Sequence, residues 1–179
     1  EDGTQSQTIT ITDNESAPSV TLTTSANSIA ENAGSSLTLT ATIGNATYED
    51  ITVSIDGTGG TGTEGTDFGT VSDITISAGA ITGTTSFTPT DDSIYDATSN
   101  ETAGISVSAV SGGGASENGT QAVTITITDN ESAPTLTLAT SASSIAENAG
   151  TSLTLTATLS NGTYQDVTAA LGTSGTATE

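Results

Sequence analysis

The chain has 179 residues, 21 of which are acidic, and it contains no lysine, arginine, histidine or cysteine, so its formal net charge is −21. Salt bridges between side chains, disulfides and lysine-based isopeptide cross-links are therefore excluded. The absence of basic side chains also argues against nucleic acid or an anionic membrane surface as a partner, because binding to phosphate groups depends on them.

Seven β-strands are predicted between the two copies of "DNESAP", which begin at Asp13 and Asp129. In chain order they span 19–24, 36–43, 50–56, 70–76, 81–88, 103–110 and 121–128. Apolar residues alternate with Thr, as in "SLTLTATI" (36–43), and this period of two is typical of strands that bury one face. No segment shows a helical period. Seven short strands in a unit of about 115 residues predict an all-β, immunoglobulin-like Greek-key β-sandwich.

An internal repeat organises the chain. Residues 117–168 align with residues 1–52 at an offset of 116, and 39 of these 52 positions are identical. Such a long period indicates a whole repeated domain. We therefore predict the last strand of a preceding repeat at 1–15, a complete domain at 16–131 and the N-terminal part of the next repeat at 132–179. The chain starts and stops within this pattern, so we expect a fragment of a longer protein. It shows no signal peptide, and no apolar run approaches the roughly 18 residues of a membrane span.

The hydrophobic core is expected to be thin. Hydrophobic residues make up 32% of the chain, with only three Tyr and two Phe and no Trp. Domains with thin cores usually need a further stabilising element, and a bound cation would also relieve the repulsion between the acidic groups. A site built only from carboxylate and carbonyl oxygens suits calcium, magnesium or manganese better than zinc or copper.

Most candidate ligands fall in loops at one pole of the predicted sandwich. If successive strands alternate in direction, the loops after the first, third and fifth strands share this pole with the segment after the seventh. The acidic residues there are Glu31, Asp67, Asp91, Asp92, Asp96, Glu101, Asp129 and Glu131. A calcium ion takes 6–8 oxygen ligands, so this pole has room for more than one ion. The alternative interpretation is that these are ordinary solvated turn residues, since Asp and Asn favour turns.

Four motifs in order carry a resemblance to a known family. They are "IAENAGSSLTLTATI", "GTGTEGTDFGTVSDITIS", "TSFTPTDDSIYD" and "VTITITDNE", and together they resemble the Calx-beta domain across 18–131. The resemblance implies calcium ligands at Glu31, Asp67, Asp91, Asp92, Asp96, Glu101, Asp129 and Glu131, with Asn130 in the closing triplet and the carbonyl of Ile94 as further candidates. Tandem copies of this Thr-rich, Lys-free composition resemble the repeat regions of large bacterial surface adhesins.

The opposite pole is expected to face the acidic pole of the preceding repeat in a head-to-tail array. Asp166 would then lie near Asp129 and Glu131, and we hypothesise that a calcium ion at this joint holds the angle between domains. Tyr48 and its copy Tyr164 are expected to pack at an edge or in the core rather than to form a binding platform.

Other functional classes have weaker support. The Thr ladders could suggest an ice-binding face, but Thr is also the usual residue on the wet face of a strand. Six Asn-X-Ser/Thr sequons occur in a chain so rich in Ser and Thr that chance explains most of them. Paired carboxylates such as Asp91 and Asp92 can act in acid–base catalysis. However, the chain has no His, Cys, Lys or Arg to act as base, nucleophile or anion clamp, so we predict that it is not an enzyme.

The sequence thus indicates a calcium-binding structural repeat of an extracellular bacterial adhesin or surface fibre, which acts as a calcium-rigidified stalk or spacer. Neighbouring repeats are the expected partners, without nucleic acid or membrane insertion. Two alternatives remain open. One is a subunit of a self-assembling extracellular filament, in which residues 1–13 are a strand donated to another unit. The other is a calcium-dependent module that binds a glycan or a protein.

Overall fold

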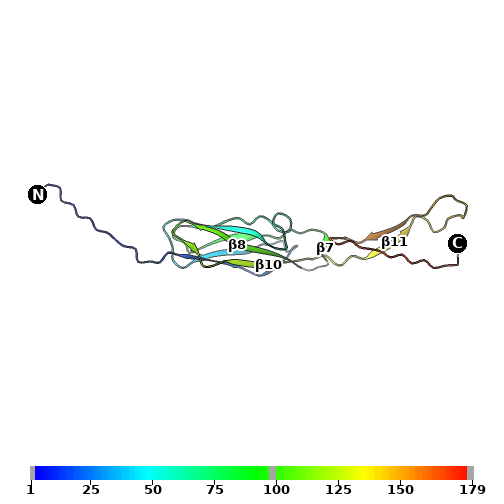
Figure 1. The fold of residues 1–179 in the computed structure, drawn as a ribbon, viewed down its shortest axis with the longest axis horizontal. Helices are drawn as coiled ribbons and strands as arrows, with labels where there is room; N and C mark the ends of the chain where they lie inside the picture. Colours follow the sequence, from blue (N-terminus) through cyan, green and yellow to red (C-terminus); the bar gives the residue numbers. More distant parts are fainter. Residues whose placement is uncertain (1–2, 97–99, 177–179) are drawn as a thin grey trace.

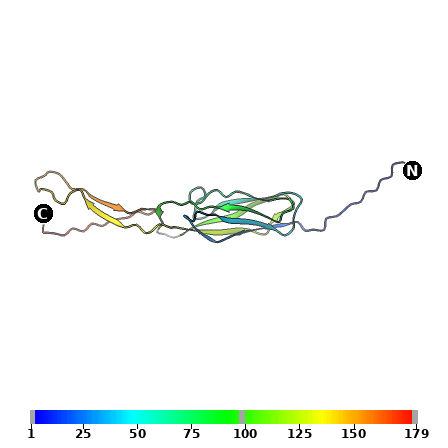
Figure 2. The ribbon, with the colours of Figure 1, turned by 180° about the vertical axis from the view of Figure 1, so that it is seen from behind.

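The protein is elongated, and three parts follow one another along its long axis (Figures 1 and 2). The computed structural model describes residues 3–96 and 100–176, so the outermost residues of the predicted segments 1–15 and 132–179 lie outside the described residues. An extended N-terminal segment leads into a β-sandwich, and a hairpin follows it. The described residues form thirteen strands and no helix, and hence no helix that could cross a membrane.

Two sheets make up the sandwich, and most neighbouring strands are antiparallel. The first sheet has four strands in the order β6 (Thr82–Phe87), β3 (Leu37–Ile43), β1 (Ser19–Thr24) and β9 (Ser116–Glu117). The second has five strands in the order β2 (Ser28–Ala30), β10 (Ala122–Thr128), β8 (Glu101–Ser111), β4 (Ile51–Gly60) and β5 (Ile74–Ile76).

The prediction of an all-β, immunoglobulin-like sandwich is confirmed, and each of the seven predicted strands has a counterpart. Their lengths differ most at two places: β4 continues to Gly60 through two irregularities in its pairing with β8, and β5 is shorter than the predicted 70–76. Within residues 16–131, three short strands were not predicted, namely β2, β9 and β7 (Ile94–Tyr95). Each pairs in parallel with a segment distant in sequence, which local periodicity does not reveal.

The core lies between the two sheets and is built from the alternating aliphatic residues. Val20 of β1, Leu39 of β3, Ile105 of β8 and Ile125 of β10 are completely buried. Phe68 and Phe87 add an aromatic pair with ring centroids 5.0 Å apart. Among the described residues no polar or charged residue is buried as a whole. The acidic side chains therefore remain at the surface, and a large group of them lies at one pole.

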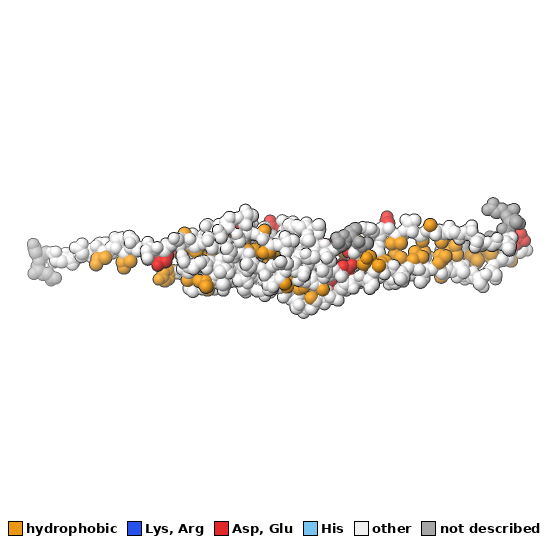
Figure 3. Space-filling model, turned by 90° about the horizontal axis from the view of Figure 1, so that it is seen from below, with side chains coloured by type: hydrophobic (Ala, Val, Ile, Leu, Met, Phe, Trp, Pro, Cys, Tyr) orange, Lys and Arg blue, Asp and Glu red, His pale blue; other side chains and the backbone are white. Residues whose placement is uncertain are grey.

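The part after the sandwich repeats its first hairpin. Strands β11 (Leu136–Thr140) and β12 (Leu155–Leu159) pair in the register of β1 and β3, so that Leu138 faces Ala157 as Leu22 faces Ala41. Leu138 is 52% exposed whereas Leu22 is 5% exposed, because among the described residues no second sheet covers this hairpin. Figure 3 shows the resulting stripe of hydrophobic side chains along this part. Strand β13 (Gly162–Thr163) turns back and pairs in parallel with β7.

Candidate metal site

Strand pairing brings three separate segments together at the acidic pole, by which we mean the end of the sandwich that carries the predicted ligands. Because β2 and β10 run in parallel with Ala30 opposite Thr128, the residues that follow them emerge side by side. The backbone N–H of Glu31 donates to the carbonyl of Thr128 at 3.1 Å. The antiparallel pairing of β8 with β10 places Glu101 opposite Ile127 at the same end.

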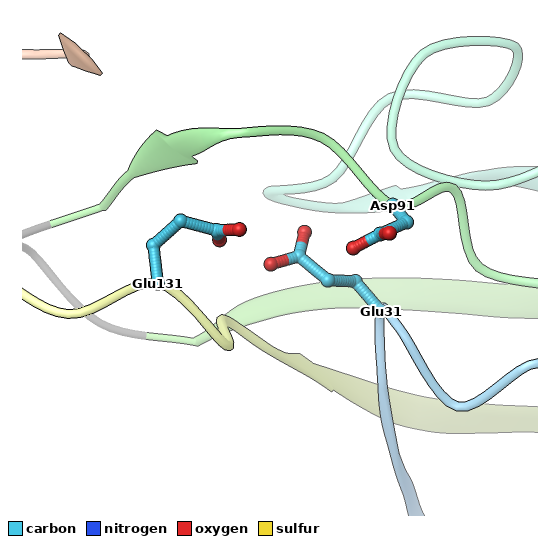
Figure 4. Close-up of side chains that lie close together, drawn as sticks. All are labelled: Glu31, Asp91 and Glu131. Carbon is cyan, nitrogen blue, oxygen red and sulfur yellow. The ribbon is translucent and has the colours of Figure 1, made fainter. Parts of the chain in front are cut away.

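Three carboxylates from three different segments converge at this pole. Glu31 follows β2, Asp91 precedes β7 and Glu131 follows β10. Their side chains point toward one another (Figure 4), and one oxygen from each lies within 4.8 Å of the other two. Three negative charges at this distance repel one another unless a proton or a cation intervenes. The triad is thus a candidate site for a positive ion.

A cleft beside the triad gathers most of the other predicted residues. Its acidic lining consists of Glu31, Asp67, Asp92, Asp96, Glu101 and Asp129, and Thr90, Ile94, Ile127 and Tyr164 complete it. The cavity at its centre has a volume of about 20 Å³, which is about the space that one water molecule occupies. Glu31 belongs to both groups, so the triad and this acidic cleft are continuous.

Backbone N–H groups orient several of these carboxylates. Asp129 accepts hydrogen bonds from the backbone N–H of Glu131 at 2.9 Å and of Asp96 at 2.8 Å. Asp67 accepts one from Thr63 at 2.6 Å, and Asp92 accepts one from Ile94 at 2.7 Å. These bonds hold the loops in shape around the cleft and leave other carboxylate lone pairs available for a ligand.

Asn130, the remaining predicted residue, contacts the triad as a donor. Its backbone N–H donates to Oε1 of Glu31 at 3.1 Å, and its side-chain Nδ2 donates to Oε1 of Glu131 at 2.9 Å. In this arrangement Asn130 positions two of the three triad carboxylates, and its amide nitrogen rather than its oxygen faces Glu131.

The electrostatics of the pole reflect its crowding. Partial burial raises the pKa of Glu31 to about 7, and the neighbouring carboxyls of Glu131 and Asp129 act in the same direction. Burial likewise raises the pKa of Glu101, with contributions from three nearby acids. The pKa of Glu131 is raised because its carboxyl shares a hydrogen bond with that of Asp129. Burial also raises the pKa of Asp129, but hydrogen bonds, chiefly with Glu131 and Asp96, outweigh it and leave this pKa below its usual value.

The set of ligand atoms at this pole suits a hard divalent cation. Among the described residues, Oε2 of Glu131 is a buried side-chain oxygen without a hydrogen-bond partner, and buried polar atoms in proteins are normally satisfied. A cation held by the triad would satisfy it. All ligands on offer are oxygen atoms, which calcium and magnesium prefer over the nitrogen and sulfur that zinc and copper favour.

Tyr164 is a site residue that the sequence did not predict. Its hydroxyl donates a hydrogen bond to Oδ2 of Asp92 at 2.7 Å, and this bond is the main reason that the pKa of Tyr164 is raised to about 12. The second repeat thus contributes Tyr164 to the cleft lining, whereas Asp166, which was expected near Asp129 and Glu131, is exposed and is not part of that lining. The prediction that Tyr48 packs at an edge or in the core is wrong, since this side chain is fully exposed. The signal available in the sequence was the recurrence of "TY" in both repeats.

Glu64 shows that not every acid in these loops faces the cleft. It lies in the same loop as Asp67, but its Oε1 accepts a hydrogen bond from the backbone N–H of Val71 at 2.8 Å. Glu64 therefore stabilises the loop beneath Phe68 rather than lining the cleft.

Comparison with known proteins returns matches among solved structures alone. No protein-family model and no curated protein matches this chain. Among solved structures, the chain is similar to the "Crystal structure of CBD12 from CALX1.2", with a TM-score of 0.49 and 19% sequence identity. The match covers 57% of this chain and 41% of that one, so less than half of that chain is represented here. What the acidic cleft can bind follows from its own residues.

Proposed function

We propose that this chain is a calcium-binding structural repeat of an extracellular bacterial adhesin or surface fibre, which acts as a calcium-stiffened stalk. The observation that carries the proposal is the convergence of Glu31, Asp91 and Glu131 within 4.8 Å in a chain that has no cationic side chain of its own. Without a bound cation or proton, the three negative charges repel one another.

Two sets of residues would hold calcium. Glu31, Asp91 and Glu131 form the first set, and the carboxylates that line the acidic cleft are candidates for a second ion. Bound calcium supplies positive charge and several coordination positions. It would cross-link the loops that follow β2 and β10 to the segment before β7. These loops are far apart in sequence, so calcium would stabilise the sandwich where its thin core ends.

The arrangement of the joint supports a stalk rather than a flexible tether. The segment between β10 and β11 is short and contains Pro134, which limits its freedom. Strand β13 pairs with β7, and Tyr164 reaches Asp92 across the joint. Acidic side chains gather beside the hydrophobic stripe of the second part (Figure 3). We therefore propose domain limits at 16–131, with the flanking segments 1–15 and 132–179 belonging to neighbouring repeats.

A thermal melt of the metal-depleted chain tests this function. Addition of calcium at about 100 times its dissociation constant should stabilise the folded state by about 2.7 kcal/mol per site. The melting temperature should therefore rise with calcium concentration, and titration calorimetry should show binding. Identical melting curves with calcium and with chelator, at calcium concentrations up to the millimolar range found outside cells, would contradict the proposal.

A filament that assembles by strand exchange is a second candidate, because residues 8–12 repeat the sequence of strand β10 and yet are exposed. Residues 8–18 are identical in sequence to 124–134. In β10, Ile125 and Ile127 are 0% and 3% exposed, whereas their copies Ile9 and Ile11 are 83% and 92% exposed. Residues 8–12 could occupy the β10 position of another domain, either in the same chain or in another copy. Size-exclusion chromatography distinguishes the filament from the stalk: ordered polymers would favour the filament, and a monomer would favour the stalk.

A further inference from the structure

A short loop of the second repeat contacts the sandwich across the joint. In this loop, residues 161–166, Gly162 and Thr163 pair in parallel with Ile94 and Tyr95 of the sandwich. The next residue, Tyr164, donates its hydroxyl hydrogen to Asp92 at the wall of the acidic cleft. This loop therefore contributes to the preceding domain both a short paired strand and the side chain of Tyr164 at the wall of the cleft.

The first repeat carries the same loop in the same conformation. Residues 45–50 contain the same Asn, Thr, Tyr and Asp at matching positions as residues 161–166. In both loops the Asn side chain donates to the carbonyl of the Ser in the connecting segment: Asn45 to Ser16 at 3.0 Å and Asn161 to Ser132 at 3.1 Å. In both, the Thr hydroxyl donates to the carbonyl two residues later. The loop therefore adopts the same conformation whether or not another domain contacts it.

This first loop is held firmly by its own domain and leaves Tyr48 without a covering. The backbone N–H of Gly79 donates to the carbonyl of Thr47 at 2.8 Å, and that of Ala78 donates to Oδ1 of Asp50 at 2.8 Å. The backbone N–H of Gly113 donates to Oε2 of Glu49 at 3.3 Å. Glu49 and Asp50, the two acids of the loop, thus accept hydrogen bonds from their own domain. The group that the loop presents outward is the neutral hydroxyl donor of Tyr48. Tyr48 is 104% exposed, whereas Tyr164 is 56% exposed.

We propose that residues 45–50 dock onto the acidic cleft of a further copy of this domain, placed before it in the same polypeptide. The hydroxyl of Tyr48 donates there to the counterpart of Asp92, and the residues before it pair with the counterparts of Ile94 and Tyr95. This inference rests on the proposed tandem function. The common Asn-to-Ser hydrogen bond favours a copy in the same chain, because it fixes the connecting segment to the loop in the same way at both joints.

A duplicated chain, in which 1–131 is followed by 16–179, tests the proposal by disulfide cross-linking. The protein contains no cysteine, so any disulfide reports the introduced pair alone. Neighbouring residues on paired strands lie within the Cα separation that a disulfide spans. We expect Thr47→Cys in the second copy to cross-link with Tyr95→Cys in the first copy at a rate similar to the Thr163→Cys and Tyr95→Cys pair in the native chain. The control replaces Thr47→Cys in the second copy by Ser77→Cys. Ser77 lies in a different loop at the same end of the domain as residues 45–50, so this pair should cross-link on the order of tenfold more slowly or not at all.

A second measurement does not depend on cysteine. With Tyr48→Phe in the first copy, nitration of Tyr48 in the second copy should be slower than nitration of Tyr48 in the native chain, because docking covers the ring and ties up its hydroxyl. The proposal is overturned if cross-linking matches the control and nitration is unchanged, or if disulfides form only between separate chains. These readouts are independent of calcium affinity. A docked loop in a chain whose melting ignores calcium would contradict the proposed function and leave this contact standing.

Discussion

The hydroxyl of Tyr164 and the carboxylate of Asp92, 72 positions apart in sequence, are joined by a hydrogen bond of 2.7 Å across the joint between two repeats. Asp92 also accepts a hydrogen bond from the backbone N–H of Ile94, which lies in the strand that pairs with the second repeat. The same carboxylate therefore orders the acidic loop and receives the neighbouring repeat. Binding of a cation at this pole and the stiffness of the joint should thus be coupled.

Tyr164→Phe should loosen the joint. The substitution removes one hydrogen bond, typically worth about 0.5–1.5 kcal/mol, and leaves the ring in place. Small-angle scattering in calcium should then show a broader distribution of interatomic distances, shifted toward shorter values as the two parts bend. Tyr48→Phe is the matched control and should leave the scattering unchanged, because Tyr48 is fully exposed. Chelation of calcium in the unsubstituted chain should have the same effect as Tyr164→Phe. A maximum dimension that does not respond to chelation would rule out calcium as the element that stiffens the joint.

Glu31→Gln should weaken calcium binding more than any other single removal of charge at this pole, because Glu31 belongs both to the triad and to the acidic cleft. We expect the calcium affinity, measured by titration calorimetry, to fall by about tenfold or more. The chain offers a close control in Glu147, which occupies the same "AENAG" sequence in the second repeat and is exposed. Glu147→Gln should retain the original affinity. Equal losses in both variants would show that overall charge, rather than the triad, governs binding.

The stability of the metal-depleted protein should fall as the pH rises from about 5 to 8. The pKa of Glu31 is raised from 4.5 to about 7 in the folded state, so between these values the folded protein retains a proton that the unfolded chain has released. The contribution of this group to stability is complete below pH 4.5 and is lost as the pH rises through about 7. The raised pKa values of Glu101 and Glu131 act in the same direction.

Melting curves of the metal-depleted chain at several pH values check this expectation. The melting temperature should decrease by a few degrees across the range, and Glu31→Gln should flatten the dependence because the amide does not titrate. Saturating calcium should also reduce the dependence, since the cation replaces the proton. A melting temperature that rises from pH 5 to 8 in metal-depleted protein would contradict the assigned direction.

Gly83→Ala should destabilise the sandwich. A Cβ at Gly83 of β6 would lie 2.3 Å from the carbonyl oxygen of Thr75 in β5, at the edge where the two sheets meet. The backbones of β5 and β6 would have to move apart to make room for it. Overpacking of this kind typically costs about 1–3 kcal/mol of stability. Gly44→Ala, where a Cβ meets nothing within 4 Å, should stay within about 0.5 kcal/mol of the original stability. Denaturant unfolding in calcium measures both, and an equal effect of the two substitutions would contradict this explanation of the close sheet contact.

Local sequence was enough to predict the seven main strands of the sandwich and the oxygen-only ligand chemistry of the site. Alternation of aliphatic residues with Thr, as from Leu37 to Ile43, places every second side chain on one face, and those at Leu39, Ala41 and Ile43 are indeed buried. A chain whose ionisable side chains are limited to Asp, Glu and Tyr can offer a metal only oxygen ligands. The parity of the strand directions also placed the acidic loops at one pole, because each strand reverses the course of the chain.

Tertiary structure decided which of these groups meet. Glu31, Asp91 and Glu131 form the triad because β2 pairs with β10 in parallel and the loop before β7 folds over both. Tyr164 reaches the acidic cleft through the pairing of β13 with β7, and neither strand has a periodic signal. Burial also depends on partners rather than pattern: Ile125 is buried and its copy Ile9 is exposed within identical sequence. A period in sequence determines which face a side chain takes, whereas contact between distant segments determines whether anything covers that face.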